Sequence, residues 1–180
     1  MCSLIFICLL LLLCTAAAQT ASTMPTIEGQ SFADQKVVLP DAARGKVAVL
    51  IFGFTKASKD PTSAWAAKLS SDVDTRPGLE LYQLPVLEDV PRFIRGILIS
   101  GIKKGVRANM RAHFVPILQH EQELKQFVNY KEPDDAYLVV LDSSGQVVLQ
   151  RHGPFNDAAY AQLKKDIQSL LDRQNLDHPR

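Results

Sequence analysis

The stretch from Lys46 to Thr55 reads KVAVLIFGFT, a nearly continuous apolar run rich in β-branched and aromatic residues. Such a run suits a strand that is buried on both faces, as at the centre of an α/β sheet. Asp60 follows as an N-cap candidate and Pro61 as the first helical position, so we predict a helix from there to about Asp72. This part of the chain therefore predicts a central strand followed directly by a helix.

The remaining elements follow in a regular order. Residues 79–87 predict a second strand, and residues 91 to about 115 predict a long helical insertion that Gly101 and Gly105 can bend. Residues 121–129 predict a short helix, residues 136–151 a β-hairpin around a Gly-containing turn, and residues 156–171 a closing helix. The order β-α-β, helical insertion, β-β-α predicts an α/β fold with a central sheet flanked by helices.

The N-terminal segment, residues 1–18, has the layout of a secretory signal peptide. An apolar run from Leu4 to Cys14 precedes Thr15 and three alanines, although no Lys or Arg precedes the run. We expect export to the periplasm or the extracellular space with cleavage after Ala18. Retention of the segment as a membrane anchor and lipidation of Cys14 remain alternatives.

The cysteines decide which chemistry a cleaved product can perform. Cys2, Cys8 and Cys14 all lie inside the signal-like segment, so cleavage after Ala18 removes every thiol of the chain. We expect residues 19–45 to form an irregular lead-in with a short strand at 36–39, and residues 46–175 to form one domain with the insertion at about 91–118. The formal net charge of +1 argues against general nucleic-acid binding.

The element order, the strand end Phe52-Gly-Phe-Thr55 and the segment from Leu138 to Gly145 resemble the thioredoxin-like superfamily. The strand end is Sco/peroxiredoxin-like, and it is most similar to the Sco branch of copper chaperones and thiol proteins. In that branch it leads into two cysteines separated by three residues, and the resemblance places Ala57 and Pro61 at these positions. It also implies a histidine metal ligand before the hairpin, where residues 128–136 contain none. The resemblance thus implies the fold without its redox cysteines, and we expect no metal site and no cofactor.

A second resemblance is to the thioredoxin-like assembly factors of the ATP synthase F0 sector and their bacterial relatives. It rests on the insertion from Pro91 to Arg107, PRFIRGILISGIKKGVR, and on the strand from Tyr137 to Asp142. Members of that family act as binding proteins rather than redox enzymes, so the resemblance implies a binding or assembly role. The signal-like N-terminus departs from the Arg-rich presequence of a mitochondrial protein, which leaves the client open.

The insertion carries two stripes of side chains at helical spacing. One stripe is apolar and consists of Ile94, Leu98, Ile102, Val106, Met110 and Phe114. The other is basic and consists of Arg95, Lys103, Arg107 and Arg111, joined by Arg92 and Lys104. Because no acidic residue occurs between Asp89 and Glu121, we predict that this helix docks on a protein partner or an anionic membrane surface. The alternative is that the apolar stripe packs on the domain's own sheet and the basic stripe is merely solvated.

Two classes of function remain open from the sequence. The four histidines, His113, His120, His152 and His178, lack the spacing of a zinc motif, and no nucleotide loop or nucleophile elbow occurs. We favour a non-catalytic thioredoxin-like binding or assembly protein of the cell envelope, with no catalytic residue assigned. The alternative is a cysteine-independent enzyme on the same scaffold, and the oligomeric state stays open.

Overall fold

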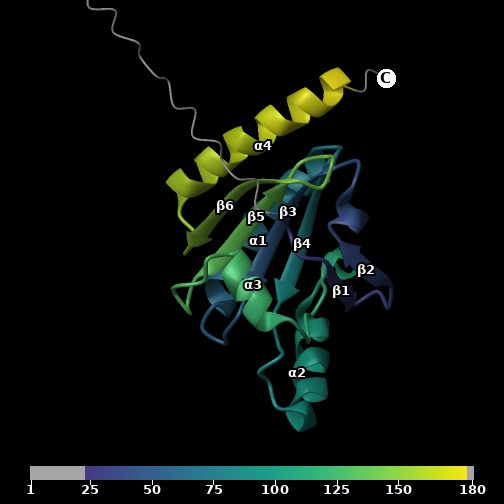
Figure 1. Ribbon diagram of the computed structural model, residues 1–180, viewed down its shortest axis with the longest axis vertical. Helices are drawn as coiled ribbons and strands as arrows, with labels where there is room; N and C mark the ends of the chain where they lie inside the picture. The colour runs from purple at the N-terminus through teal and green to yellow at the C-terminus, as the bar shows by residue number, and fades with distance from the viewer. Residues whose placement is uncertain (1–22, 178–180) are drawn as a thin grey trace, which may run out of the picture.

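A four-stranded mixed sheet forms the centre of the molecule in the computed structural model, which describes residues 23–177 (Figure 1). Its strands are β3 (Val47–Gly53), β4 (Leu79–Pro85), β5 (Ala136–Leu141) and β6 (Val147–Gly153), in the order β4-β3-β5-β6. β4 runs parallel to β3, and β5 runs antiparallel to both β3 and β6. The predicted position of β3 is confirmed, because it lies inside the sheet and its residues from Val47 to Phe52 are all buried. The predicted signal segment, residues 1–18, lies outside the described residues.

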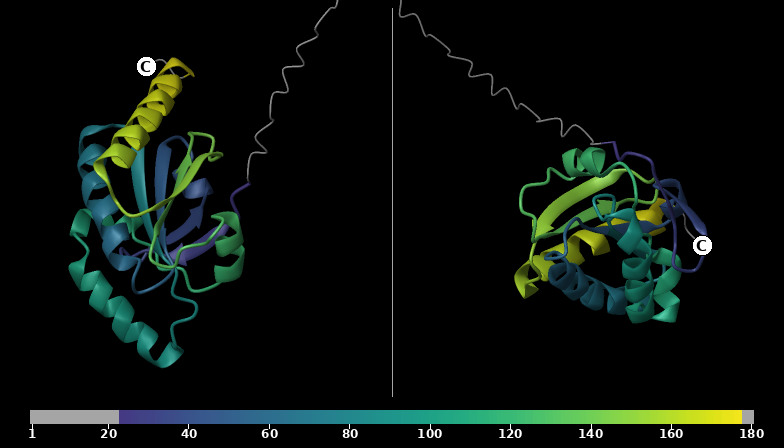
Figure 2. Two further views of the ribbon diagram at one scale, coloured as in Figure 1. Left: turned by 90° about the vertical axis from the view of Figure 1, so that its left-hand side faces the viewer. Right: turned by 90° about the horizontal axis from the view of Figure 1, so that it is seen from below.

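One face of the sheet is covered by two long helices, α1 (Lys59–Thr75) and α4 (Asp157–Asp177) (Figures 1 and 2). Trp65 and Leu69 of α1 and Leu163 and Ile167 of α4 join an apolar cluster with the residues of β3 that face this side. Each fully buried side chain of this size contributes about 1.5–3 kcal/mol to folding. Burial of these apolar faces therefore holds both helices on the sheet.

The α1–α4 contact also buries a charged group. The Asp72 carboxylate accepts a hydrogen bond from the Tyr160 hydroxyl at 2.7 Å and lies 3.1 Å from the Lys164 ammonium. Burial and this hydrogen bond raise the pKa of Tyr160 to about 12. A buried carboxylate without such partners would cost several kcal/mol, so this cluster fixes how the two helices meet.

The other face is covered by shorter elements: β1 (Ile27–Gln30), β2 (Lys36–Leu39), the 3-10 turn η1 (Asp41–Ala43) and α3 (Glu121–Phe127). The expectation of a short strand at 36–39 is confirmed. The expectation of an otherwise irregular lead-in is wrong, because residues 27–30 pair antiparallel with that strand. Ile27 and Leu39, opposite each other in this pairing, both enter the apolar cluster on this face. That burial stabilises a hairpin whose short strands carry little signal of their own.

The first helix starts two residues earlier than predicted. It begins at Lys59 with Ser58 as its N-cap residue, so Asp60 and Pro61 lie in the first turn. The Thr55 hydroxyl oxygen accepts a hydrogen bond from the Ser58 amide at 3.1 Å, and the Ser58 hydroxyl donates to the Thr55 carbonyl at 2.8 Å. These bonds close a turn that leads straight into the helix and recruits Lys59 into it.

The helical insertion is shorter than predicted. Helix α2 (Arg92–Gly105) ends where Val106 becomes extended, and a 3-10 helix, η2 (Ala108–His113), follows. Residues 114–117 then run beside β4, where the Val115 amide donates to the Gln83 carbonyl and the Ile117 amide to the Pro85 carbonyl, each at 2.9 Å. Phe114 and Val115 are buried in this extended conformation. Burial against the sheet thus overrides the helical periodicity beyond Gly105.

Candidate functional site

The loop between β3 and α1 contains Ala57 and Pro61, the positions that the resemblance assigns to the two cysteines of the Sco branch. Ala57 is exposed and Pro61 half-buried, and neither side chain carries a polar atom. Ser58 is the buried hydroxyl of this loop, and its oxygen is engaged with the Thr55 backbone. The Thr55 hydroxyl donates to the Pro133 carbonyl at 2.7 Å, which ties the loop to the segment before β5. The hydrogen-bond capacity of this site is therefore used to hold the loop in place.

An aromatic cluster lies next to this loop. Phe54 packs edge-on against Tyr130 and Tyr137 with ring centroids 5.1 and 5.6 Å apart, and His152 stacks on Tyr137 at 5.3 Å. The Tyr137 hydroxyl accepts hydrogen bonds from the amides of Lys131 and Glu132 and donates to the Glu132 carbonyl. Phe54 and Tyr137 are buried, so the cluster mainly packs the end of the sheet.

A histidine–carboxylate pair, His152 with Asp135, lies beside this aromatic cluster. The His152 Nδ1 lies 2.6 Å from the Asp135 carboxylate, while part of the ring is exposed. A carboxylate in this position orients an imidazole for general-base work. Within residues 23–177 no Ser or Thr hydroxyl hydrogen-bonds to this ring, so the pair has no partnered nucleophile. The pair was not predicted from the sequence, because a register shift between Val140 and Leu141 sets the pairing: counting back from the turn without it places Arg151, not His152, opposite Tyr137.

A second polar cluster surrounds Glu80, near the start of β4 and at the opposite end of the sheet from the β3–α1 loop. The Glu80 carboxylate lies 2.6 Å from the Lys46 ammonium and 3.8 Å from His113 Nε2, and it accepts a hydrogen bond from the Tyr82 hydroxyl at 2.9 Å. Burial opposes ionisation of Glu80, but the interactions with His113, Lys46 and Tyr82 outweigh it and lower the pKa of Glu80 from 4.5 to about 2. Burial and the adjacent Glu80 carboxylate raise the pKa of Tyr82. Each polar group here has a partner, which is typical of a structural ion pair rather than a reactive site.

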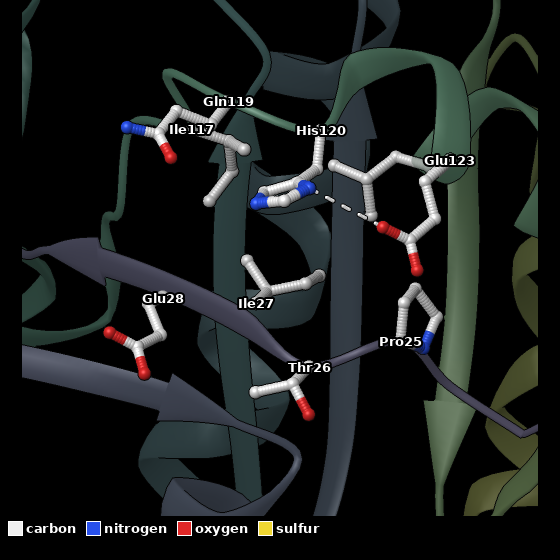
Figure 3. A pocket seen from close by; sticks show the side chains of 9 residues that line it. Pro25, Thr26, Ile27, Glu28, Ile117, Gln119, His120 and Glu123 are labelled. Atoms are coloured by element: carbon white, nitrogen blue, oxygen red, sulfur yellow. Dashed lines mark ion pairs between the residues drawn. The ribbon is translucent and has the colours of Figure 1, made fainter.

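Among the hollows of the described surface, two lie beside helices α3 and α2. One lies between β1 and the start of α3 and is bordered by the ion pair of His120 and Glu123, 3.5 Å apart (Figure 3). Its volume of about 10 Å³ admits no more than one water molecule. The other is an open cleft of about 170 Å³ between α2 and the β1–β2 turn, lined in part by Phe32, Ile99 and Lys103. Neither matches the enclosed apolar pocket of several hundred Å³ that a small-molecule site requires.

Metal ligands do not gather either. In the part of the chain from residue 23 to 177, no three His, Cys, Asp or Glu side chains come close enough to hold a metal ion. His113 and His120 contact different carboxylates, those of Glu80 and Glu123, and His178 lies outside the described residues. None of the helices within this range combines the length and the apolar character that crossing a bilayer requires.

Helix α2 is the most unusual surface of the molecule. None of its fourteen residues is buried, and it projects from the body at the end opposite to α4 (Figures 1 and 2). Phe93 is 84% exposed and Ile97 76% exposed, and Ile94 and Leu98 beside them are also exposed. The interpretation that the whole apolar stripe packs on the domain's own sheet is therefore wrong for α2. It holds for Met110 and Phe114, which lie beyond the helix and are buried.

The six predicted basic residues do not form one exposed stripe. Arg95 donates to the backbone carbonyls of Val90 and Glu88, and the Lys103 ammonium lies 3.3 Å from Asp34. Arg107 and Arg111 lie outside α2, and Arg111 donates to the Val106 carbonyl. The exposed members are Arg92, Lys104 and Arg107, which make no ion pair with any residue from 23 to 177. The expected stripe fails for two reasons: Arg95 and Lys103 contact the body of the protein, and the helix ends at Gly105, before Arg107 and Arg111.

Comparison with solved structures identifies the scaffold. BsSco, described as a member of the Sco family of cytochrome c oxidase assembly proteins, superposes with a TM-score of 0.60 at 14% identity, covering 82% of this chain and 92% of that one. A SCO1/SenC family lipoprotein from Bacillus anthracis gives 0.56 at 15% identity, covering 84% of this chain and 96% of that one. A DsbE-type putative thiol:disulfide interchange protein from Chlorobium tepidum gives 0.55 at 17% identity, covering 82% and 94%.

These likenesses extend over nearly the whole of each similar structure but rest on low sequence identity. No family model matches the chain, and no curated protein sequence matches it. The similar proteins include lipoproteins and thiol-disulfide proteins, and the resemblance to ATP synthase F0 assembly factors has no counterpart among those compared above. The mixed sheet, its strand order and these superpositions together confirm the predicted architecture: the chain has the thioredoxin-like fold.

Proposed function

We propose that the protein is a non-catalytic thioredoxin-like binding or assembly protein of the cell envelope, without thiol redox activity. The observation that carries the proposal is the β3–α1 loop, which bears Ala57 and Pro61 where the resemblance expects cysteines. Disulfide exchange requires a thiolate as the attacking group, and neither residue can form one. Every cysteine of the chain lies between Cys2 and Cys14, ahead of the domain.

A binding role is supported by the outward face of α2. An exposed Phe and three exposed aliphatic side chains on one helix are more than folding of the domain needs, and such faces commonly mark interaction sites. An assembly role is supported by the insertion's resemblance to ATP synthase F0 assembly factors. The similar protein BsSco is likewise described as an assembly protein, of cytochrome c oxidase. The signal-like residues 1–18 support a place in the envelope, with a membrane anchor if they are retained.

The test is an insulin-reduction assay of the full chain beside a Cys2→Ser/Cys8→Ser/Cys14→Ser variant. We expect both proteins to remain at the background rate set by dithiothreitol, because the domain offers no thiolate. Dithiol-dependent turnover by the wild type that disappears in the triple variant would mean that the N-terminal cysteines act as a redox centre. The proposal would then be wrong.

A second candidate is a cysteine-independent enzyme, and the pair of His152 and Asp135 favours it. An imidazole oriented by a carboxylate can activate a water molecule for hydrolysis. Hydrolysis of p-nitrophenyl acetate by the wild type above that of a His152→Ala variant would support this candidate. Equal hydrolysis rates of the wild type and the variant would contradict the enzyme candidate.

A further inference from the structure

The outward face of α2 allows a more specific inference, which rests on the proposed function and names the partner. We propose that α2 docks flat on an anionic lipid bilayer. Phe93 and Ile97 enter the boundary between headgroups and acyl chains, and Arg92, Lys104 and Arg107 lie against the lipid phosphates. The domain above the helix stays in water.

The spacing of the apolar residues defines the inserting face. Phe93 and Ile97 are four residues apart, as are Ile94 and Leu98, so the two pairs form adjacent rows along the first two turns. All four side chains are exposed, and the two most exposed share one row. The outward surface is thus an apolar strip that continues into Lys104, seven residues after Ile97 on the same helix face, while Arg92 and Arg107 are exposed at the start of the helix and beyond its end.

The opposite face of α2 is fixed to the protein. The Arg95 guanidinium donates to the carbonyls of Glu88 and Val90 at 2.7 and 2.8 Å, which holds the first turn against the preceding loop. Lys103 reaches Asp34 near the other end of the helix, where Ile99 also faces the β1–β2 turn across the cleft. These contacts at both ends orient the helix, so its apolar face points away from the body before any partner arrives.

Charge selects an anionic partner for this face. Arg92, Lys104 and Arg107 are exposed and unpaired with any described residue, and the sequence has no acidic residue between Asp89 and Glu121. Two copies of α2 meeting face to face would bring these like charges together, which disfavours self-association. A basic charge near an anionic bilayer, by contrast, contributes favourably, and salt screens that attraction.

The shape of the region favours a flat surface over a groove. The helix lies at one end of the molecule and stands clear of the sheet, so a broad plane can reach it without meeting another element (Figures 1 and 2). Its fourteen residues span about 21 Å, less than the about 30 Å of a hydrocarbon core. It therefore lies in the plane of the interface as an amphipathic helix does, with basic residues beside an apolar face.

The experiment places a reporter on α2 itself, because the signal-like N-terminus of the full chain can bind vesicles independently. The native Trp65 is 2% exposed and supplies a constant background. Full-length Phe93→Trp is mixed with vesicles of phosphatidylcholine alone or with phosphatidylglycerol, with or without brominated acyl chains. The matched control is Leu176→Trp on α4, a position that is 80% exposed and far from α2 (Figure 1).

We expect a blue shift and bromine quenching for the Trp at position 93 with phosphatidylglycerol vesicles, and neither effect for the control. Ile97→Ser should lower the partition coefficient of the Phe93→Trp protein by about tenfold. Burial of one aliphatic side chain changes an equilibrium constant by about that factor or more. Lys104→Glu with Arg107→Glu should abolish the preference for anionic vesicles. The inference would be overturned if the emission of the Trp at position 93 neither shifted nor was quenched on addition of anionic vesicles.

A pull-down from envelope extract separates failure of this inference from failure of the proposed function. If position 93 ignores vesicles while Ile97→Ser loses an acidic protein that the wild type retains, the face binds protein. The membrane inference is then wrong and the binding role stands. If position 93 inserts but the insulin assay finds cysteine-dependent turnover, the inference stands and the non-redox proposal is wrong.

Discussion

Gly53, at the end of β3, lets the first turn of α1 approach the sheet closely. A Cβ atom on this residue would lie 2.9 Å from the Ser58 hydroxyl oxygen and 3.1 Å from Thr62 Cγ2. Both neighbours belong to the loop and helix start that hold Ala57 and Pro61 in place. A side chain at this position would therefore press on the turn that leads into α1.

We expect Gly53→Ala to lower the free energy of unfolding by about 1–3 kcal/mol, because the crowded turn has to shift. The measurement is urea denaturation followed by the fluorescence of Trp65. Gly101→Ala is the uncrowded control, since a Cβ there has no neighbour within 4 Å, and loss of a glycine from a helix interior should raise the free energy of unfolding by about 0.5–1 kcal/mol. Equal stability of Gly53→Ala and the wild type would contradict the close packing.

The Glu80 cluster makes stability depend on pH. The pKa of Glu80 is lowered to about 2, so its ionised form stabilises the fold above the ordinary value of 4.5. The contribution is lost as pH falls from 4.5 towards 2. After allowance for solvent screening we assign it about 2 kcal/mol.

Glu80→Gln should therefore be less stable than the wild type by about 2 kcal/mol at neutral pH, and the gap should close as the pH is lowered below 4.5. Urea denaturation at a series of pH values measures this, with Glu28→Gln as the exposed control that should show little difference at any pH. A gap that stays constant down to pH 3 would show that the Glu80 charge is not the cause.

At the scale of elements, the insertion divides into a helix that buries none of its residues, α2, and a following segment whose apolar side chains are buried in the fold. Phe93 in α2 is 84% exposed, whereas Phe114 after η2 is 8% exposed and stacks on Phe32 with ring centroids 4.6 Å apart. We expect Phe93→Ala to change the free energy of unfolding by less than about 0.5 kcal/mol and Phe114→Ala to lower it by about 3–5 kcal/mol. Chemical denaturation of the two variants compares them directly. Similar losses would mean that α2 packs on the domain after all.

The same division explains what the sequence could and could not predict about the insertion. Periodicity alone places Ile94 and Phe114 on one stripe, because both fit the same four-residue spacing. The chain leaves the helix at Val106, since Phe114 and Val115 gain more by burial beside β4 than by continuing the helix. That choice depends on a sheet edge distant in sequence, which no local pattern contains. The predicted basic set consequently held Arg95, Lys103 and Arg111, which contact the protein itself, beside the three exposed residues.

At the scale of the whole molecule, the central elements were predictable because their signals are local. The apolar run of β3, the hairpin around Gly145 and the spacing of Leu163 and Ile167 each specify an element without reference to the rest. The β1 strand and the pair of His152 and Asp135 depend on contacts between distant residues. The sequence thus predicted that the β3–α1 loop lacks cysteines, but it did not predict which side chains contact each other there.

Helix α2, with no buried residue, also bears on how this protein evolves. A core position such as Leu69 tolerates few replacements, because packing against neighbours limits the side chain that fits. Phe93 and Ile97 escape that limit, so mutation would replace them freely with polar residues if folding were the only requirement. Their persistence among close orthologues would therefore measure selection for an external contact alone, and it would register that selection before any ligand is in hand.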